Sequence, residues 1–514
     1  MFYRIEIVVL LLLMIMPAAL AKTILYVPFD DRPVSLSYPI DTVKAAKFDI
    51  LTPPVEYLAS RGKSGDSEQL WRWVMDNAGK ADALVLSADA LTYGGLVDSR
   101  THHFNQILLE WSLRRFNVLH GQNPKVPIYV FSTIMRSPSA SAGGVEPLYY
   151  EKYGPSIFWL TALQDKEEVK GLTAEETAVM QAAKDNIPSE DLKDWLERRN
   201  KNFQINAQLI DLTRQGVIQY LVLGRDDTSP FSQSHKEGRE LGKLAAGLSA
   251  DQYRSFPGAD QLGMILLARA YNHLIAQVPS VEIRYMLGMA EATIPSYEDQ
   301  PFGGTLADHV VAAGGKIRTA EKKTDLILAV NTPINGHTAE AGMVGNIPYV
   351  TGAMHSFVSD IDNEIKNGSS VAIADIAFAN GADNSLMREM YEHKLLDKVS
   401  AYSGWNTASN TLGYAIGQGM MAKTMNDTGR KRVLAVRYLD DWAYQANIRA
   451  DLYKNIVYSQ QGIEEDIARM DPELTLELTK EMKSFVTKYL WFSPDKMKVS
   501  FPWNRLFEIK VEMK

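Results

Sequence analysis

The chain has 514 residues, which exceeds a usual single domain, so we expect one large domain with insertions or a main domain followed by a second one. Its formal net charge of −8 argues against a nucleic-acid-binding surface, since such surfaces are basic. The absence of Cys excludes disulfides, thiolate metal sites and a Cys nucleophile.

The N-terminus has the pattern of a secretory signal peptide. An apolar stretch over 7–16 is followed by Pro17 and by Ala19-Leu20-Ala21, the small-x-small pattern that precedes a cleavage site. The apolar segment is shorter than the ~20 residues that span a bilayer, although an uncleaved anchor is the alternative. We therefore expect 1–21 to be removed, giving a secreted or periplasmic protein without a stable membrane span.

Short apolar runs alternate with segments of helix-favouring sequence from residue 23 onward. A βαβ alternation predicts a parallel sheet with right-handed crossovers. Eight runs are predicted as strands, at 24–28, 49–52, 83–87, 127–133, 220–224, 281–287, 325–330 and 371–376. The predicted helices are 38–46, 67–78, 105–119, 237–248, 261–276 and 305–313.

The strand count favours an α/β fold of the (β/α)8 TIM-barrel-like type with insertions, over residues 22–400. The close spacing of the runs between 281 and 330 fits two doubly wound parallel-sheet domains as well. The charged interval 137–216 interrupts the rhythm and is predicted as a helical insertion or lid, with an ordinary crossover helix pair as the alternative. Residues 401–514 are predicted as a continuation with a polar site loop (402–419), one strand (432–437) and helices.

Asp226 and Asp227 are the candidate catalytic residues, because they directly follow a predicted buried strand. Loops at the carboxyl ends of parallel strands build active sites, and neighbouring strand residues point to opposite faces, so one of the two acids should enter the site. Glycoside hydrolysis uses two such carboxyl groups on either side of the scissile bond. The structural alternative is a helix N-cap or turn.

Two further strand ends carry candidate substrate-binding residues. Asp30, Asp31 and Arg32 close the first strand, where Arg can hold one carboxylate and leave the other free. Asp89, Tyr93 and Arg100 surround a Gly pair after the third strand, where backbone could approach a ligand closely. A structural ion pair and a tight loop are the respective alternatives.

Later segments add amides and an aromatic ring. Amide and hydroxyl groups beside an aromatic face are suited to neutral, polyhydroxylated ligands, although a buried Trp with capping amides is equally expected. The candidate substrate-binding residues of these segments are Asn331, Asp375, Asn380, Asp383, Trp405 and Asn406.

No cofactor is predicted, and a divalent metal is the alternative. The nine His are scattered, without HExxH, but Asp30, Asp31, Asp226 and Asp227 could form an all-carboxylate site if their strands adjoin. Neither a GxGxxG or Walker pattern nor a GxSxG elbow occurs.

Six separated segments resemble a bacterial family described only as domain of unknown function 4127. The resemblance covers nearly the whole mature chain and brings no activity with it. The acid pair at 226–227 also resembles, more weakly, the paired acids of substrate-assisted hexosaminidases, which are carbohydrate-active barrels. The six segments are FDDRPV (29–34), DALTYGGLVDSR (89–100), GRDDTSP (224–230), PGADQ (257–261), NGADN (380–384) and SGWNTASNTLG (403–413).

The functional hypothesis is an extracytoplasmic carbohydrate-active hydrolase that uses paired aspartates on a small-molecule or oligosaccharide substrate. A metal-dependent hydrolase and a non-catalytic carbohydrate-binding protein are the alternatives. All three require acid clusters that are distant along the chain to meet at one edge of the sheet structure.

Overall fold

The computed structural model describes residues 21–140, 144–318 and 324–514. The predicted signal peptide therefore lies, except for its last residue, outside the described residues. Within the described ranges, no helix is both long enough and apolar enough to cross a membrane.

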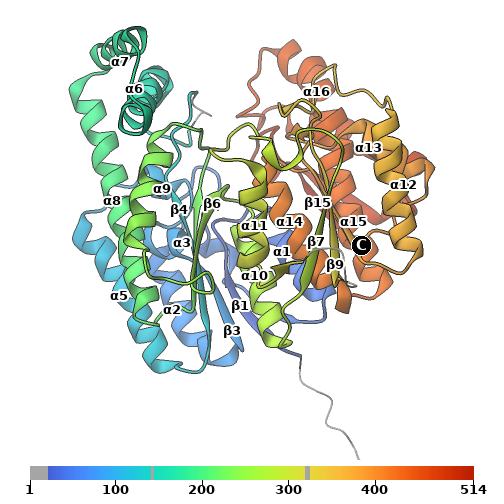
Figure 1. The fold of residues 1–514 in the computed structure, drawn as a ribbon, viewed down its shortest axis with the longest axis horizontal. Helices are drawn as coiled ribbons and strands as arrows, with labels where there is room; N and C mark the ends of the chain where they lie inside the picture. The colour runs from blue at the N-terminus through green and yellow to red at the C-terminus, as the bar shows by residue number, and fades with distance from the viewer. Residues whose placement is uncertain (1–20, 141–143, 319–323) are drawn as a thin grey trace, which may run out of the picture.

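The larger strands form two separate parallel sheets that stand side by side (Figure 1). The first has the order β2-β1-β3-β4-β5-β6 and the second the order β13-β11-β9-β7-β8. The strands of the first sheet are β1 Thr23–Val27, β2 Asp49–Leu51, β3 Ala83–Ser87, β4 Ile128–Ile134, β5 Tyr220–Arg225 and β6 Tyr253–Pro257. Those of the second are β7 Ser280–Tyr285, β8 Lys316–Ile317, β9 Leu326–Asn331, β11 Val371–Asp375 and β13 Ala401–Ser403.

The α/β class and the parallel pairing are as predicted, but the two sheets do not form the single ring that a (β/α)8 barrel requires. The arrangement is compatible with the alternative of two parallel-sheet units. The alternation of strands and helices is the same in both architectures, so it does not show which strands are neighbours. Each sheet is doubly wound: the strand order reverses between β1 and β3 in the first and between β7 and β9 in the second.

Helices cover both faces of the first sheet. The outer face packs against α2 (Ser67–Asn77), α5 (Gln106–Gln122), α8 (Ser189–Arg214) and α9 (Gln233–Leu244), which contribute to one apolar core. The inner face packs against α1 (Ser37–Ala45), α10 (Leu262–Leu274) and α14 (Ala408–Met421). A second core contains residues of both sheets and of these inner helices, so the two sheets share one apolar interior.

Helix α14 lies at the centre of the molecule, and all of its residues are buried. Three glycines make this possible: a Cβ at Gly413 would lie 2.4 Å from the side chain of Gln261, and one at Gly419 would lie 2.9 Å from the Cβ of Ala372. Gly417 similarly faces Met264 of α10. Of the polar loop predicted over 402–419, only 404–407 lies outside helices and strands; 408–419 is helical, because the small residues there serve close helix packing and not chain flexibility.

The predicted strand 432–437 is also wrong. Residues Asp427–Arg437 form helix α15, which begins where the side chain of Asn426 accepts a hydrogen bond from the backbone N–H of Gly429. A short continuous apolar run reads the same in a buried strand and in a buried helix, and residues 433–437 are all buried.

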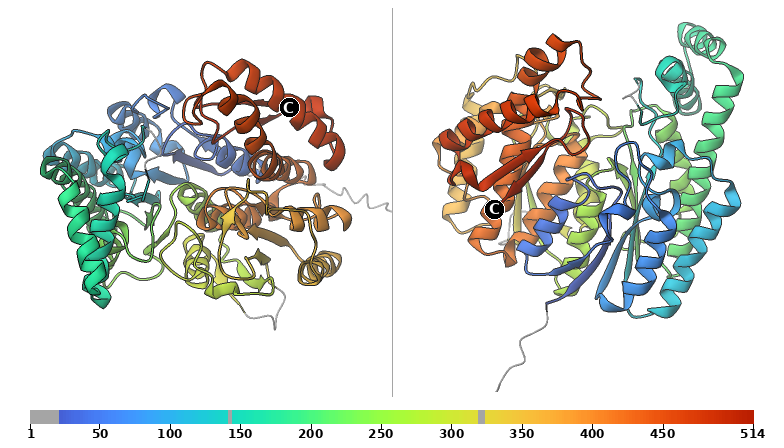
Figure 2. Two further views of the ribbon diagram at one scale, coloured as in Figure 1. Left: turned by 90° about the horizontal axis from the view of Figure 1, so that it is seen from above. Right: turned by 180° about the vertical axis from the view of Figure 1, so that it is seen from behind.

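The interval 137–216 contains three helices, α6 (Tyr150–Lys170), α7 (Ala174–Asn186) and α8. A capping box between Thr173 and Glu176 begins α7. Helix α8 runs back along the first sheet and connects to β5, whereas α6 and α7 project beyond the carboxyl end of that sheet (Figures 1 and 2).

The remaining helices cover the second sheet and the C-terminal part of the chain (Figure 2). A π-helical segment at Tyr438–Ile448 follows α15, and an antiparallel pair of strands lies near the C-terminus. These elements are α11 Phe302–Ala312, α12 Gly352–Lys366, α13 Asn384–Glu392, α16 Arg449–Leu452, α17 Asp471–Tyr489, β14 Met497–Ser500 and β15 Lys510–Met513.

Candidate functional site

A cavity of about 290 Å³ lies where segments from the carboxyl ends of both sheets meet the C-terminal part of the chain. This volume is near the lower end of the range for small-molecule sites. Its polar and aromatic lining residues are Arg32, Arg100, Arg136, Asp226, Asp227, Asp260, Tyr297, Asn380, Asn406, Thr407, Asn410, Arg449, Glu464, Glu465, Trp503, Arg505 and Phe507.

The first wall of the cavity follows β1, at the point where the strand order of the first sheet reverses. The guanidinium of Arg32 binds Asp30 with Nη2 2.8 Å from Oδ2, and it also binds Asp260 with Nη2 2.7 Å from Oδ1. Asp30 is buried beneath Arg32, so Arg32 faces the cavity and Asp30 holds it in place.

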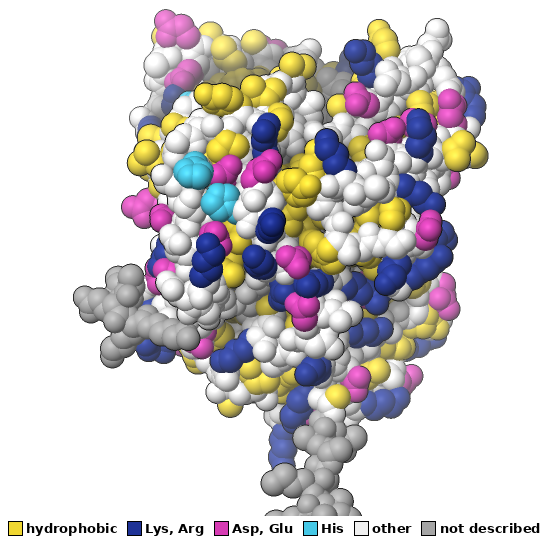
Figure 3. All heavy atoms as spheres, turned by 90° about the vertical axis from the view of Figure 1, so that its right-hand side faces the viewer, with side chains coloured by type: hydrophobic (Ala, Val, Ile, Leu, Met, Phe, Trp, Pro, Cys, Tyr) yellow, Lys and Arg dark blue, Asp and Glu magenta, His cyan; other side chains and the backbone are white. Residues whose placement is uncertain are grey.

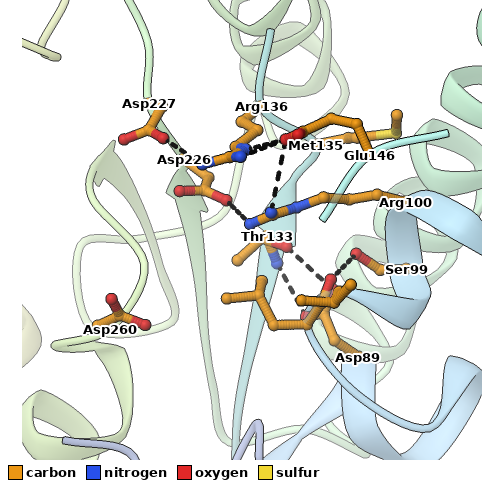
Figure 4. Close-up of polar contacts among 12 residues, drawn as sticks. Asp89, Ser99, Arg100, Thr133, Met135, Arg136, Glu146, Asp226, Asp227 and Asp260 are labelled. Atoms are coloured by element: carbon orange, nitrogen blue, oxygen red, sulfur yellow. Dashed lines mark hydrogen bonds and ion pairs between the residues drawn. The ribbon is translucent and has the colours of Figure 1, made fainter. Parts of the chain in front are cut away.

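The loop after β5 provides the predicted acid pair (Figure 4). Asp226 forms an ion pair with Arg100, and Asp227 accepts a hydrogen bond from Nη1 of Arg136 at 2.7 Å. Both acids line the cavity, because β5 ends at Arg225 and Asp227 adopts a left-handed backbone with φ of 34°. The expected alternation of side chains between two faces does not apply beyond the strand end.

Asp260, which follows β6, completes a group of three acids. The carboxyl groups of Asp226, Asp227 and Asp260 point toward the same open space in Figure 4. Burial raises the pKa of Asp227, and the neighbouring charge of Asp226 raises it further, against the opposing effect of Arg136. Burial likewise raises the pKa of Asp260, although Arg32 opposes the shift. A carboxyl group with a raised pKa beside other carboxyl groups is suited to proton transfer to or from a ligand.

The opposite wall carries amides and aromatic rings. Asn406, which has a left-handed φ of 61°, lies with Nδ2 3.4 Å from Oδ2 of Asp260. The amide of Asn380 and the hydroxyl of Tyr297 both donate to Glu340, over 2.8 and 3.1 Å. Asn380 and Asn406 were both predicted to bind substrate, and both line the cavity.

The C-terminal part of the chain supplies a further wall. Trp503 Nε1 donates to Oδ1 of Asp31 at 2.6 Å, and this contact joins the loop after β1 to residues 472 positions later. Phe507 and Arg505 lie beside Trp503 in the lining, with the guanidinium of Arg505 5.0 Å from the centroid of the Trp503 ring. Asp31 is thus close to the cavity, but its carboxylate accepts the hydrogen bond of Trp503.

Asp89 and Tyr93, although predicted to bind substrate, do not line the cavity. They belong to a short helix, α3 (Ala88–Tyr93), which the side chain of Ser87 caps. Asp89 is fully buried and accepts hydrogen bonds from the backbone N–H and the hydroxyl of Thr133, and burial raises its pKa to about 7. Tyr93 stacks on His102 in the interior.

Asn331, Asp375 and Asp383 form a separate buried group at the carboxyl end of the second sheet. The Asn331 amide donates to Asp375 at 2.9 Å and to Asp383 at 3.0 Å, and Asp383 caps α13. None of the three lines the cavity. Trp405 is also buried and does not line the cavity, so none of these four predicted binding residues faces it.

A family model described as "Protein of unknown function (DUF4127)" matches residues 24–512. The chain belongs to the DUF4127 family. No similar protein was found among curated proteins or among solved structures.

The cavity coincides with the segments that carry the DUF4127 resemblance. Each of the six segments contributes at least one lining residue: Arg32; Arg100; Asp226 and Asp227; Asp260; Asn380; Asn406, Thr407 and Asn410. The segments that resemble the family and the cavity therefore lie at the same place in the fold.

The alternative of an all-carboxylate metal site is not supported by these positions. Asp30, Asp226 and Asp227 each bind a different arginine. In the described residues, the group of three metal-ligating side chains with close ligand atoms lies elsewhere, on α12 and α13.

Sequence reasoning missed several lining residues. Asp260 follows β6, whose sequence YRSFP lacks the apolar run of a central strand because β6 is at the sheet edge. Arg136 follows the predicted strand 127–133 and could have been found by the same argument as Asp226. Trp503, Arg505 and Phe507 follow no predicted strand, and only their aromatic and basic character is visible in the sequence.

Proposed function

We propose that the chain is a carbohydrate-active hydrolase in which Asp227 acts as the acid and Asp226 as the second carboxyl group. The proposal is supported by one observation above the others: three carboxyl groups from two strand ends point into one cavity, and the pKa of Asp227 is raised. A raised pKa lets a carboxyl group retain the proton that a glycosidic leaving oxygen requires.

The proposed roles follow from the contacts of each acid. Arg100 holds Asp226 in an ion pair, which positions this carboxylate to polarise a water molecule or the substrate. Asp227 is the more exposed of the two, with a quarter of its side chain accessible, so its proton can reach a ligand. Asp260 and the Asn406 amide would bind hydroxyl groups beside them.

The rest of the lining is suited to a sugar. Amides of Asn380, Asn406 and Asn410 offer both donors and acceptors, and Trp503 and Phe507 offer apolar rings beside them. The volume of about 290 Å³ is that of a site for a small ligand. An extracytoplasmic location, which the N-terminal sequence predicts, is part of the proposal.

The experiment is a screen of chromogenic glycosides and short oligosaccharides with the mature protein, followed by kinetics of Asp226→Asn and Asp227→Asn. General acid or base catalysis contributes ~10²–10⁴-fold, so each variant should lose at least ~100-fold in kcat/KM. Asp251→Asn, at a nearly fully exposed carboxylate, is the matched control and should keep the wild-type rate.

Three outcomes contradict the proposal. Full activity in both variants would exclude the assigned acids. Activity abolished by a chelator and restored by a divalent ion would favour the metal-dependent hydrolase. Stoichiometric sugar binding without turnover would favour a carbohydrate-binding protein.

A further inference from the structure

Two histidines and two acids lie together on α12 and at the end of α13, away from the cavity. His355 Nδ1 lies 2.5 Å from Glu389 Oε1, and His393 Nε2 lies 3.2 Å from the same oxygen. Ligand atoms of His355, Glu389 and His393 all lie within 4.8 Å of one another. The face shown in Figure 3 carries two His side chains side by side among acidic ones.

A fourth residue orients this group. His393 Nδ1 lies 3.3 Å from Oδ2 of Asp362, while its Nε2 faces Glu389. When Asp362 accepts the Nδ1 proton, the lone pair of Nε2 is directed at the space between His355 and Glu389. This is the carboxylate–histidine–metal arrangement, in which an outer carboxylate fixes the tautomer of a metal-binding imidazole.

We propose that His355 Nδ1, a Glu389 carboxylate oxygen and His393 Nε2 bind one divalent transition metal of the Zn²⁺ class. Bond lengths of ~2.0–2.2 Å to nitrogen and oxygen in tetrahedral geometry place the ligand atoms about 3.4 Å apart. His393 and Glu389 are already near this spacing. His355 must move outward by about 1 Å, and its side chain is 63% exposed and free to do so.

The ligand set selects the class of metal. Imidazole nitrogens suit zinc, copper, nickel and iron, whereas magnesium and calcium take oxygen ligands.

The site joins two helices that cover the outer face of the second sheet. His355 and Asp362 belong to α12, whereas Glu389 belongs to the last turn of α13 and His393 is the residue that follows this helix. A bound metal therefore cross-links α12 and α13 and stabilises their packing. None of the four residues lines the cavity, so this site is separate from the proposed active site.

The experiment titrates ZnCl₂ into metal-stripped protein without a polyhistidine tag and follows binding by calorimetry. The wild type should bind one Zn²⁺ per chain with a dissociation constant of micromolar or below, and its Tm should rise on addition of the metal. The combined His355→Ala and His393→Ala substitutions should abolish both effects. Asp362→Asn should retain the stoichiometry and weaken affinity by roughly 10-fold, because outer carboxylates contribute ~10–100-fold.

His337→Ala is the matched control, since it removes an exposed histidine from a different loop. It should bind Zn²⁺ as the wild type does. The proposal is overturned if the wild type shows no saturable binding at micromolar Zn²⁺, or if binding survives the double substitution. An unchanged Tm of each metal-free variant, compared with the metal-free wild type, establishes that the variants are folded.

Discussion

Arg32 Nη2 and Asp260 Oδ1 lie 2.7 Å apart, although 228 positions separate them in the chain. The contact joins the loop after β1 to the loop after β6, near opposite edges of the first sheet. Because the same guanidinium also holds Asp30, one buried positive charge is paired with two carboxylates beside the cavity.

We expect Arg32→Met to destabilise the fold by about 3 kcal/mol, because removing one partner leaves buried carboxylates without compensation. Arg214→Met is the matched control, since Arg214 forms an exposed pair with Asp211 and should contribute less than ~1 kcal/mol. Urea unfolding of both variants measures the difference. Equal losses in the two variants would show that the Arg32 cluster is no more important than a surface ion pair.

Gly413→Ala should destabilise by ~1–3 kcal/mol, because the new Cβ would overlap the side chain of Gln261. Gly242→Ala, within α9, adds a Cβ that meets no atom within 4 Å, so it should instead stabilise by ~0.5–1 kcal/mol through its helix propensity. Thermal unfolding of the two variants gives shifts of opposite sign if α14 is packed as described. A stabilising Gly413→Ala would mean that α14 and α10 lie farther apart.

Burial raises the pKa of Asp375 to about 7, from about 4 in an unfolded chain. The folded state therefore binds an extra proton between these values, and this contribution to stability is lost as pH rises from about 4 to 7. Asp375→Asn removes the titration and leaves one acceptor oxygen for the donors Asn331, Asp383 and Tyr402, which the two carboxylate oxygens share in the wild type. We expect its destabilisation to be largest at pH 5 and to shrink by up to ~1.4 kcal/mol per pH unit toward pH 8. Denaturant unfolding of both proteins at pH 5 and pH 8 measures this; a difference that does not change with pH would contradict the raised pKa.

If Asp227 is the acid, the alkaline limb of kcat/KM reports its pKa, because activity falls as that carboxyl loses its proton. The charge of Arg136 lowers this pKa, so Arg136→Met should raise it and move the limb to higher pH. The measurement is a pH–rate profile on a substrate from the glycoside screen, with Arg214→Met as the control that leaves the limb in place. A limb that stays fixed or moves to lower pH assigns the titration to another group.

The strand ends were predictable because a buried parallel strand reads as an apolar run and the polar residues after it must lie at one edge. This argument found Arg32, Arg100, Asp226 and Asp227. It could not separate residues that enter the cavity from those one layer below it, such as Asp89 and Asp375, since both kinds follow the same strands. That distinction depends on the local hydrogen bonds of Thr133 and Asn331, which the linear pattern does not contain.

The division of the strands into two sheets and the C-terminal wall of the cavity could not be predicted from the sequence, for a different reason. Strand order depends on which faces pack together. The Gly-rich sequence of α14 resembles that of a loop as long as its neighbours α10 and β11 are not known. Trp503 reaches Asp31 through tertiary packing alone.

The glycine contacts of α14 also limit how a ligand can reach the cavity. Separating the two sheets would break the close contacts that α14 makes with α10 at Gly413 and Gly417 and with β11 at Gly419, and it would expose their shared apolar interior to water. We therefore expect the sheets to move as one rigid body. On this expectation, ligands enter and leave through small displacements of segments at the rim, such as that of Tyr297, and not through domain opening.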